Sequence, residues 1–192
     1  MILLFLGCTS CTIFTTRTPE PPDTRRSSFQ PPTSSQIVIA NLQAAIREKN
    51  IENYIQCLVA GDSGTVQQRY TFEPSSEAAA RFASVFIAWS VVRERQSFTA
   101  FAAKIPQMSA PTIQLSNDRF ELMSPDSVVY VADYLIRPNA QQNGVAAEFS
   151  GRMRLTIASF ASGFWGIRRW SDQTAAQSSS ASWSVLKAQF AN

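Results

Sequence analysis

The residue types that could do chemistry in this chain are carboxylates and phenols, because histidine is absent from all 192 residues. Without histidine there is no Ser-His-Asp or Cys-His catalysis, no histidine-ligated metal and no imidazole acid or base at neutral pH. The sequence also lacks a Walker loop, a dinucleotide-binding fingerprint, a paired-cysteine metal pattern and a nucleophile elbow. These absences exclude many enzyme classes, and we expect no cofactor and no metal.

Asp133 is the strongest candidate for acid–base chemistry. It lies in the middle of a predicted strand, and its same-face neighbours are the apolar residues Val129, Val131 and Leu135. A carboxylate among apolar neighbours has a raised pKa and can act as a base. The alternative is that this face is turned to solvent, or that Asp133 pairs with Arg152 or Arg154 on a neighbouring strand. We favour the alternative.

Asp172 is the second candidate. It follows Trp170 by two residues and therefore shares its face of a strand, where it would line the mouth of a pocket. The alternative, which we favour, is a strand-terminal carboxylate that caps a loop amide or pairs with Arg169.

Glu94 and four aromatic residues complete the candidate set. Glu94 would enter a pocket from a helix, unless it pairs with Arg93 or Lys104, which is the preferred interpretation. The aromatic residues are predicted to be core side chains first and a ligand platform second. They are Tyr54, Trp89, Trp165 and Trp170.

The first half of the chain is predicted to be helical. Thr33 and Gln36 form a capping-box pattern at the start of a helix that ends before Asn50, and a second short helix follows it. Helical spacing of apolar residues then runs from Ser76 to Ile105. A single helix of that length is unusual in a small domain, so we expect a break near residues 95–97.

The second half alternates between apolar and polar residues, which predicts antiparallel strands. The predicted strands cover 112–116, 120–123, 127–137 and 145–159, and the last forms a hairpin with 164–170. Strict alternation would set Trp165 and Trp170 on opposite faces. A bulge at Arg168-Arg169 would place both indoles on the covered face and bend the sheet, and we favour it. A final short helix is expected around Trp183.

The N-terminus predicts export. Residues 1–8 form a short apolar run that ends in Leu-Gly-Cys, which resembles the lipobox of bacterial lipoproteins. We therefore expect a lipid on Cys8, with Cys11 as a weaker candidate. Basic residues are missing before the apolar run, which leaves open a true start upstream. Residues 9–33 are rich in Pro, Thr and Ser and are predicted to be a flexible tether to one domain over 34–192.

The composition agrees with a folded domain. Hydrophobic residues make up 45% of the chain and charged residues 16%, which is enough apolar material for a core. The net charge is +3, and no basic run is longer than a pair, so nucleic acid is not an expected partner. Cys57 lies between apolar residues and is predicted to be a buried thiol.

The order of helices followed by an antiparallel meander resembles the nuclear transport factor 2 (NTF2)-like superfamily, and in particular the bacterial NTF2-like and SnoaL-like domains. The residues that carry this resemblance are Asn41-Leu42, 54–58, Phe72-Glu73-Pro74, Trp89-Ser90, Glu94, 165–167, 170–172, Trp183 and Leu186-Lys187. The resemblance implies an α+β cone, with N-terminal helices packed on a strongly curved antiparallel sheet. It also implies a pocket between them, and the candidate lining residues are Tyr54, Trp89, Asp133, Trp165, Trp170 and Asp172.

The leading functional hypothesis is an exported, lipid-anchored domain in the bacterial cell envelope, at the periplasm or outer membrane. It would bind a small apolar ligand or a protein partner without catalysis. The first alternative is an isomerase- or dehydratase-like enzyme that uses Asp133 or Asp172 as base. The second is a structural homodimer.

Overall fold

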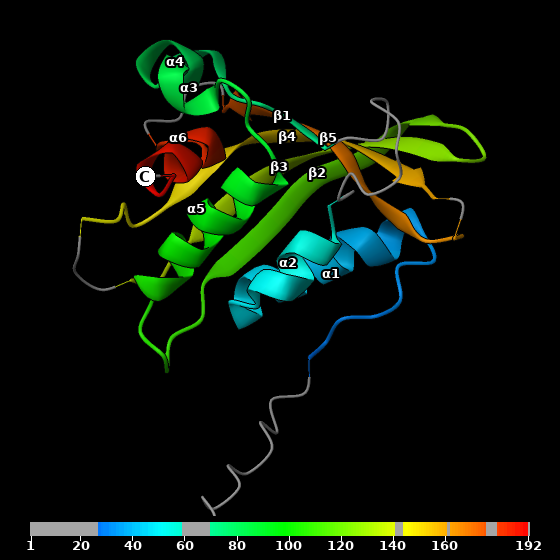
Figure 1. Ribbon diagram of the computed structural model, residues 1–192, viewed down its shortest axis with the longest axis horizontal. Helices are drawn as coiled ribbons and strands as arrows, with labels where there is room; N and C mark the ends of the chain where they lie inside the picture. Colours follow the sequence, from blue (N-terminus) through cyan, green and yellow to red (C-terminus); the bar gives the residue numbers. More distant parts are fainter. Residues whose placement is uncertain (1–26, 59–69, 141–143, 161, 176–179, 192) are drawn as a thin grey trace, which may run out of the picture.

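The computed structural model describes residues 27–58, 70–140, 144–160, 162–175 and 180–191, and it shows helices against one five-stranded sheet (Figure 1). The strand order is β1-β5-β4-β3-β2, with β1 parallel to β5 and the other pairs antiparallel. The strands are β1 (Thr71–Glu73), β2 (Thr112–Met123), β3 (Ser127–Arg137), β4 (Phe149–Ser159) and β5 (Trp165–Thr174). The helices are α1 (Ser35–Glu48), α2 (Ile51–Gln56), α3 (Ser76–Arg81), α4 (Ala83–Phe86), α5 (Val91–Ala103) and α6 (Trp183–Gln189). The predicted α+β class is confirmed.

One face of the sheet, here called the inner face, carries the buried side chains. Along β4, Met153, Leu155 and Ile157 have no exposed surface, whereas Arg152 and Arg154 alternate with them on the outer face. Figure 1 shows α1, α2, α5 and α6 along the side of the sheet that these residues face. Removing each such apolar side chain from water stabilises the fold by about 1.5–3 kcal/mol.

The bulge predicted in β5 is confirmed. Thr156 pairs with Arg169 and Ile157 pairs with Ile167, so Arg168 is the extra residue on β5. The extra residue reverses the alternation, and Ile167 and Trp170 therefore both lie on the inner face with no exposed surface.

The first helix begins one residue later than the sequence suggests. Ser34, and not Thr33, is the N-cap, and its Oγ accepts a hydrogen bond from the backbone N–H of Ile37 at 3.4 Å. Either hydroxyl could cap, and the backbone enters the helix at Ser35.

The long helical stretch breaks earlier than predicted. Helices α3 and α4 end by Phe86, and α5 begins at Val91, so the break covers 87–90 and not 95–97. Ala88 has a φ of 57°, a left-handed conformation that a helix cannot contain. This turn directs Trp89 back into the core, where it is 7% exposed.

Residues 27–33, expected to be part of the tether, lie against the domain. Gln30 and Asn41 on α1 exchange two hydrogen bonds, from Gln30 N to Oδ1 at 2.9 Å and from Nδ2 to Gln30 O at 2.7 Å. The N–H of Trp165 on β5 donates to Pro32 O at 2.7 Å. Cys8, Cys11 and the rest of the predicted leader and tether lie outside the described residues.

No helix in the described part of the chain has the length and apolar character that crossing a membrane requires. Cys57 is 1% exposed, as predicted.

Candidate functional site

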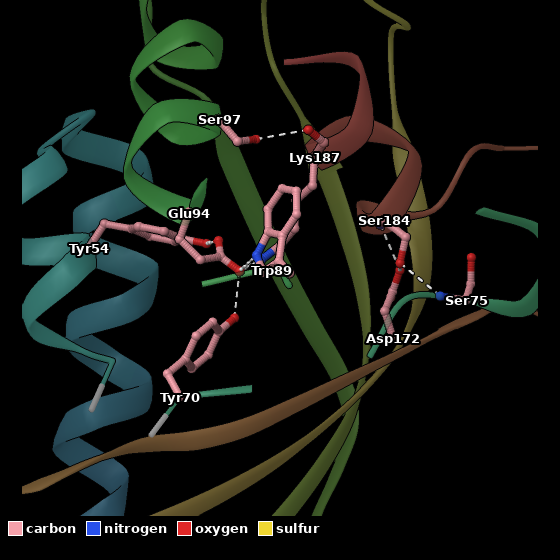
Figure 2. Close-up of polar contacts among 9 residues, drawn as sticks. All are labelled: Tyr54, Tyr70, Ser75, Trp89, Glu94, Ser97, Asp172, Ser184 and Lys187. Atoms are coloured by element: carbon pink, nitrogen blue, oxygen red, sulfur yellow. Dashed lines mark hydrogen bonds and ion pairs between the residues drawn. The ribbon is translucent and has the colours of Figure 1, made fainter. Parts of the chain in front are cut away.

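Two buried polar clusters lie between the helices and the inner face, and the first surrounds Glu94. The Glu94 side chain extends from the first turn of α5 and is 1% exposed. Tyr54 donates to its Oε2 at 3.0 Å, while Tyr70 at 2.5 Å and the indole N–H of Trp89 at 2.8 Å donate to Oε1. Lys187 on α6 forms an ion pair with the same Oε1. Figure 2 shows these side chains converging from four separate parts of the chain.

Aromatic rings surround the Lys187 ammonium. Its Nζ lies 4.1 Å from the ring centroid of Phe72, 4.4 Å from that of Trp170 and 5.8 Å from that of Trp89. Each ring presents a negative face to the cation and partly replaces the water that burial removes. The Lys187 side chain is 2% exposed, so its charge depends on these rings and on Glu94.

Burial shifts the pKa values in this cluster. It lowers the pKa of the Lys187 ammonium, and the Glu94 carboxylate opposes that shift. Burial raises the pKa of Tyr54 and of Tyr70 well above its usual value, and the negative charge of Glu94 raises both further. Both phenols are therefore protonated donors at neutral pH.

The second cluster surrounds Asp172 on β5. Tyr134 donates to its Oδ1 at 2.7 Å, and Ser184 donates to Oδ2 through its backbone N–H at 2.7 Å and its hydroxyl at 2.5 Å. Ser184 Oγ in turn accepts from the N–H of Ser75 at 2.9 Å, and Tyr134 Oη accepts from the N–H of Trp183 at 2.7 Å. Asp172 therefore connects the sheet to the start of α6 (Figure 2).

Asp172 is 3% exposed, and burial raises its pKa although hydrogen bonds from Ser184 and Tyr134 oppose the shift. The residue also belongs to the wall of an open polar recess of about 450 Å³. A carboxylate that acts as a base needs an oxygen that can reach a substrate proton. Here both oxygens of Asp172 already accept hydrogen bonds from the protein.

Asp133 lies on the outer face, away from both clusters. Arg152 donates to its two oxygens at 2.7 and 3.2 Å, and Asn117 donates to Oδ2 at 2.8 Å. These hydrogen bonds lower the pKa of Asp133, so the hypothesis of a raised pKa at this position is wrong. The apolar neighbours were misleading because they share a partly exposed outer face with Asp133, and the alternative pairing with Arg152 is the one observed.

The four predicted aromatic residues occupy two places. Tyr54, Trp89 and Trp170 are buried in the core, and Trp170 packs edge-on against Trp183 with ring centroids 4.5 Å apart. Trp165 is only partly buried and lines a groove outside the core.

Little open space is seen next to the clusters in the described part of the core. A void between Phe98, Phe101, Trp183 and their neighbours measures about 10 Å³, which is barely the space that one water molecule needs. Among the described residues, no three side chains of the metal-ligating acidic and thiol types gather closely enough to hold a metal ion.

A groove of about 820 Å³ lies next to the N-terminal segment. Its wall is mostly apolar, and the apolar members are Phe29, Pro31, Pro32, Ile55, Leu58, Phe160, Phe164 and Trp165. The polar members are Gln56, Ser162 and the ion pair between Arg95 and Glu52. The groove thus combines a broad apolar wall with a few polar groups, as small-molecule sites do.

No protein-family model matches the sequence, and no protein of curated function matches it either. Solved structures do match its fold. A proposed dehydratase from the NTF2-like family of Streptomyces avermitilis aligns with a TM-score of 0.55 and 8% identity, over 73% of this chain and 93% of that one. The protein has the NTF2-like fold.

Two further structures with this fold give the same result. A proposed scytalone dehydratase from Novosphingobium aromaticivorans aligns with a TM-score of 0.55 and 10% identity, over 77% of this chain and 88% of that one. An NTF2-like protein from Cytophaga hutchinsonii aligns with a TM-score of 0.50 and 14% identity, over 72% and 93%. The NTF2-like resemblance read from the sequence is therefore confirmed at the level of the fold.

Sequence reasoning did not include Tyr70 or Lys187 among the candidate site residues, although both belong to the cluster around Glu94. It also gave Glu94 the wrong partner, because Arg93 donates instead to the backbone O of Ala191 at 3.0 Å. One signal was present: Lys187 stands four residues after Trp183, in the apolar stripe of α6 that also holds Leu186. A lysine in a buried stripe needs a buried acceptor, and Glu94 is that acceptor.

Proposed function

We propose that the protein is a non-catalytic binding domain, exported and lipid-anchored in a bacterial cell envelope, which takes a small apolar ligand in the groove beside Trp165. The observation that carries this proposal is the contrast between the filled core and the open groove. Every oxygen of the core carboxylates accepts a hydrogen bond from the protein, whereas the groove offers about 820 Å³ lined mostly by apolar side chains.

The size and lining of the groove suit a small molecule. Ligand pockets commonly measure 300–1,000 Å³, with apolar walls and a few polar groups that fix orientation. Phe164 is 44% exposed, so a ligand that covers it removes apolar surface from water. Gln56 and Ser162 supply hydrogen-bonding groups at the wall.

The state of the inner carboxylates argues against the isomerase- or dehydratase-like alternative. Such an enzyme needs a carboxylate oxygen directed at its substrate. Glu94 accepts from Tyr54, Tyr70 and Trp89, and Asp172 accepts from its own set of donors. A substrate would have to break these bonds before any proton could move.

The groove lies at the end of the domain that an anchor on Cys8 would hold. Phe29 and Pro31 line the groove, and they belong to the segment that leads back to the expected lipid site. Residues 9–26 separate Cys8 from the described chain and reach roughly 60 Å when fully extended. This arrangement favours a ligand that partitions into membranes.

The groove is tested with N-phenyl-1-naphthylamine, a neutral apolar dye whose fluorescence rises in apolar sites. The wild-type chain should bind it saturably, and Phe164→Ser should weaken binding about tenfold because the ring no longer covers the dye. Met108→Ser is the matched control, because Met108 is 98% exposed and is not a groove residue. Equal affinity in Phe164→Ser and wild type would contradict the groove assignment.

The anchor is tested by growing a bacterial host with a labelled fatty acid. The wild-type chain and Cys11→Ala should incorporate the label, whereas Cys8→Ala should not. If Cys8→Ala takes up as much label as wild type, the anchor on Cys8 is refuted.

A further inference from the structure

The surroundings of the Lys187 ammonium have the composition of a cation-binding site. Three aromatic rings, from Phe72, Trp89 and Trp170, lie within 5.8 Å of its Nζ, and Glu94 supplies the counter-charge. Aromatic cages of this kind recognise ammonium groups of ligands through the negative faces of the rings.

The cage is complete without the helix that carries the cation. Its rings come from β1, from the turn before α5 and from β5, and its carboxylate comes from α5. The rings also support one another: the centroid of Phe72 lies 5.8 Å from that of Trp89 and 6.3 Å from that of Trp170. Helix α6 contributes Lys187 to this cage, and its Trp183 packs against the outer side of the cage at Trp170.

The protein's own neutral donors also hold the carboxylate of the cage in place. Glu94 Oε1, the atom that faces the ammonium, is fixed by donors from Tyr70 and Trp89, and Tyr54 holds Oε2. Neutral donors that hold a carboxylate also fix its direction, so Glu94 presents a positioned acceptor to a cation.

We propose that this cage is a binding site for a primary ammonium group, and that Lys187 is its resident ligand, delivered by α6. The helix holds the ammonium in place through contacts outside the cage. Ser97 Oγ donates to the backbone O of Lys187 at 3.0 Å, and Asp172 accepts from Ser184 in the first turn of α6. Lys187 therefore meets the cage as a tethered group, at high effective concentration.

The test removes the resident cation and supplies a free one. Lys187→Ala deletes Cγ, Cδ, Cε and Nζ, and n-propylammonium has the same three carbons and one nitrogen. In the full-length variant, n-propylammonium chloride should raise the melting temperature by about 3–5 °C at ten times its dissociation constant, in a saturable manner. Equal concentrations of 1-propanol or sodium chloride should not raise it.

Three control chains separate cation recognition from cavity filling. Wild type and Lys187→Met, whose cages are filled, should show no shift with n-propylammonium. Lys187→Ala combined with Glu94→Gln should also lose the shift, because the counter-charge is gone. A shift that 1-propanol reproduces, or one that persists without Glu94, would overturn the proposal.

If Lys187→Ala does not fold alone, the same comparison is made on refolding from urea. The recovery of native Trp fluorescence should then depend on n-propylammonium and not on 1-propanol. Failure of n-propylammonium to bind the folded variant or to restore its folding also overturns the proposal. Dye binding in the groove is a separate measurement, so the two proposals can fail independently.

Discussion

Removing both members of the buried Glu94–Lys187 pair should cost much less than the sum of the losses from removing each one alone. In Lys187→Met the lysine side chain is replaced by an uncharged side chain of similar length. The Glu94 carboxylate then stays buried with neutral donors only. Breaking a buried ion pair in this way costs about 3–5 kcal/mol, a large share of the roughly 5–15 kcal/mol that stabilises a domain.

The double variant with Glu94→Gln leaves no buried charge in the pair. The amide oxygen of a glutamine can still accept from Tyr70 or Trp89, so part of the hydrogen bonding survives. We therefore expect the double variant to lose at least ~2 kcal/mol less than the sum of the two single losses. The coupling arises because each single variant leaves an uncompensated charge and the double variant leaves none.

Urea unfolding at neutral pH measures this cycle, with the fluorescence of buried Trp170 and Trp183 as the signal. The control pair is Arg95→Met with Glu52→Gln, an ion pair whose side chains are 42% and 68% exposed. Exposed pairs contribute about 0–1 kcal/mol, so this second cycle should show little coupling. Additive losses at Glu94 and Lys187, or a loss below ~1 kcal/mol in Lys187→Met, would refute the reasoning.

Three further predictions follow from single residues. Burial raises the pKa of Asp172, so the folded chain keeps a proton that the unfolded chain releases above about 3.9. The contribution of Asp172 to stability should therefore fall as pH rises above about 3.9. In urea unfolding at pH 3.5–7, the stability of wild type relative to Asp172→Asn should decrease as the pH rises, and a constant difference would contradict the raised pKa. Burial raises the pKa of the Cys57 thiol to about 12, so the folded chain should not react with Ellman's reagent at pH 8. In a chain with Cys8→Ser and Cys11→Ser, the reagent should label Cys57 only after unfolding. Labelling of the folded chain would contradict this prediction. A Cβ on Gly151 would lie 2.4 Å from Tyr134 Oη, so Gly151→Ala should lose about 1–3 kcal/mol or more in thermal unfolding, and an unchanged melting temperature would contradict the contact.

Local patterns in the sequence predicted most of the sheet. Alternation along β4 identified its buried side, and the five-residue spacing of Trp165 and Trp170 indicated the bulge at Arg168. Both features depend on neighbours in the chain, which a sequence displays directly. The break before α5 was predicted at the wrong residues because it depends on the left-handed conformation of Ala88. Alanine seldom adopts this conformation, so the residue type does not indicate it.

The candidate site was harder to predict because its contacts join distant parts of the chain. Asp133 was correctly placed on a strand, but its surroundings depend on Arg152 across the sheet. Glu94 and Lys187 are 93 residues apart, and only the packing of α6 on α5 brings them together. Periodicity assigns a residue to a face, and it does not say which charge lies opposite.

The two buried clusters explain how so short a helix has one fixed position. Helix α6 has seven residues, and isolated helices of that length do not persist in water. Apolar contacts alone would let it slide or rotate by one residue, whereas a buried charge tolerates no such shift. Ser184 on Asp172 fixes the first turn, and Lys187 on Glu94 fixes the next. The core carboxylates thereby help to position α6, and the apolar groove beside Trp165 is a separate concavity.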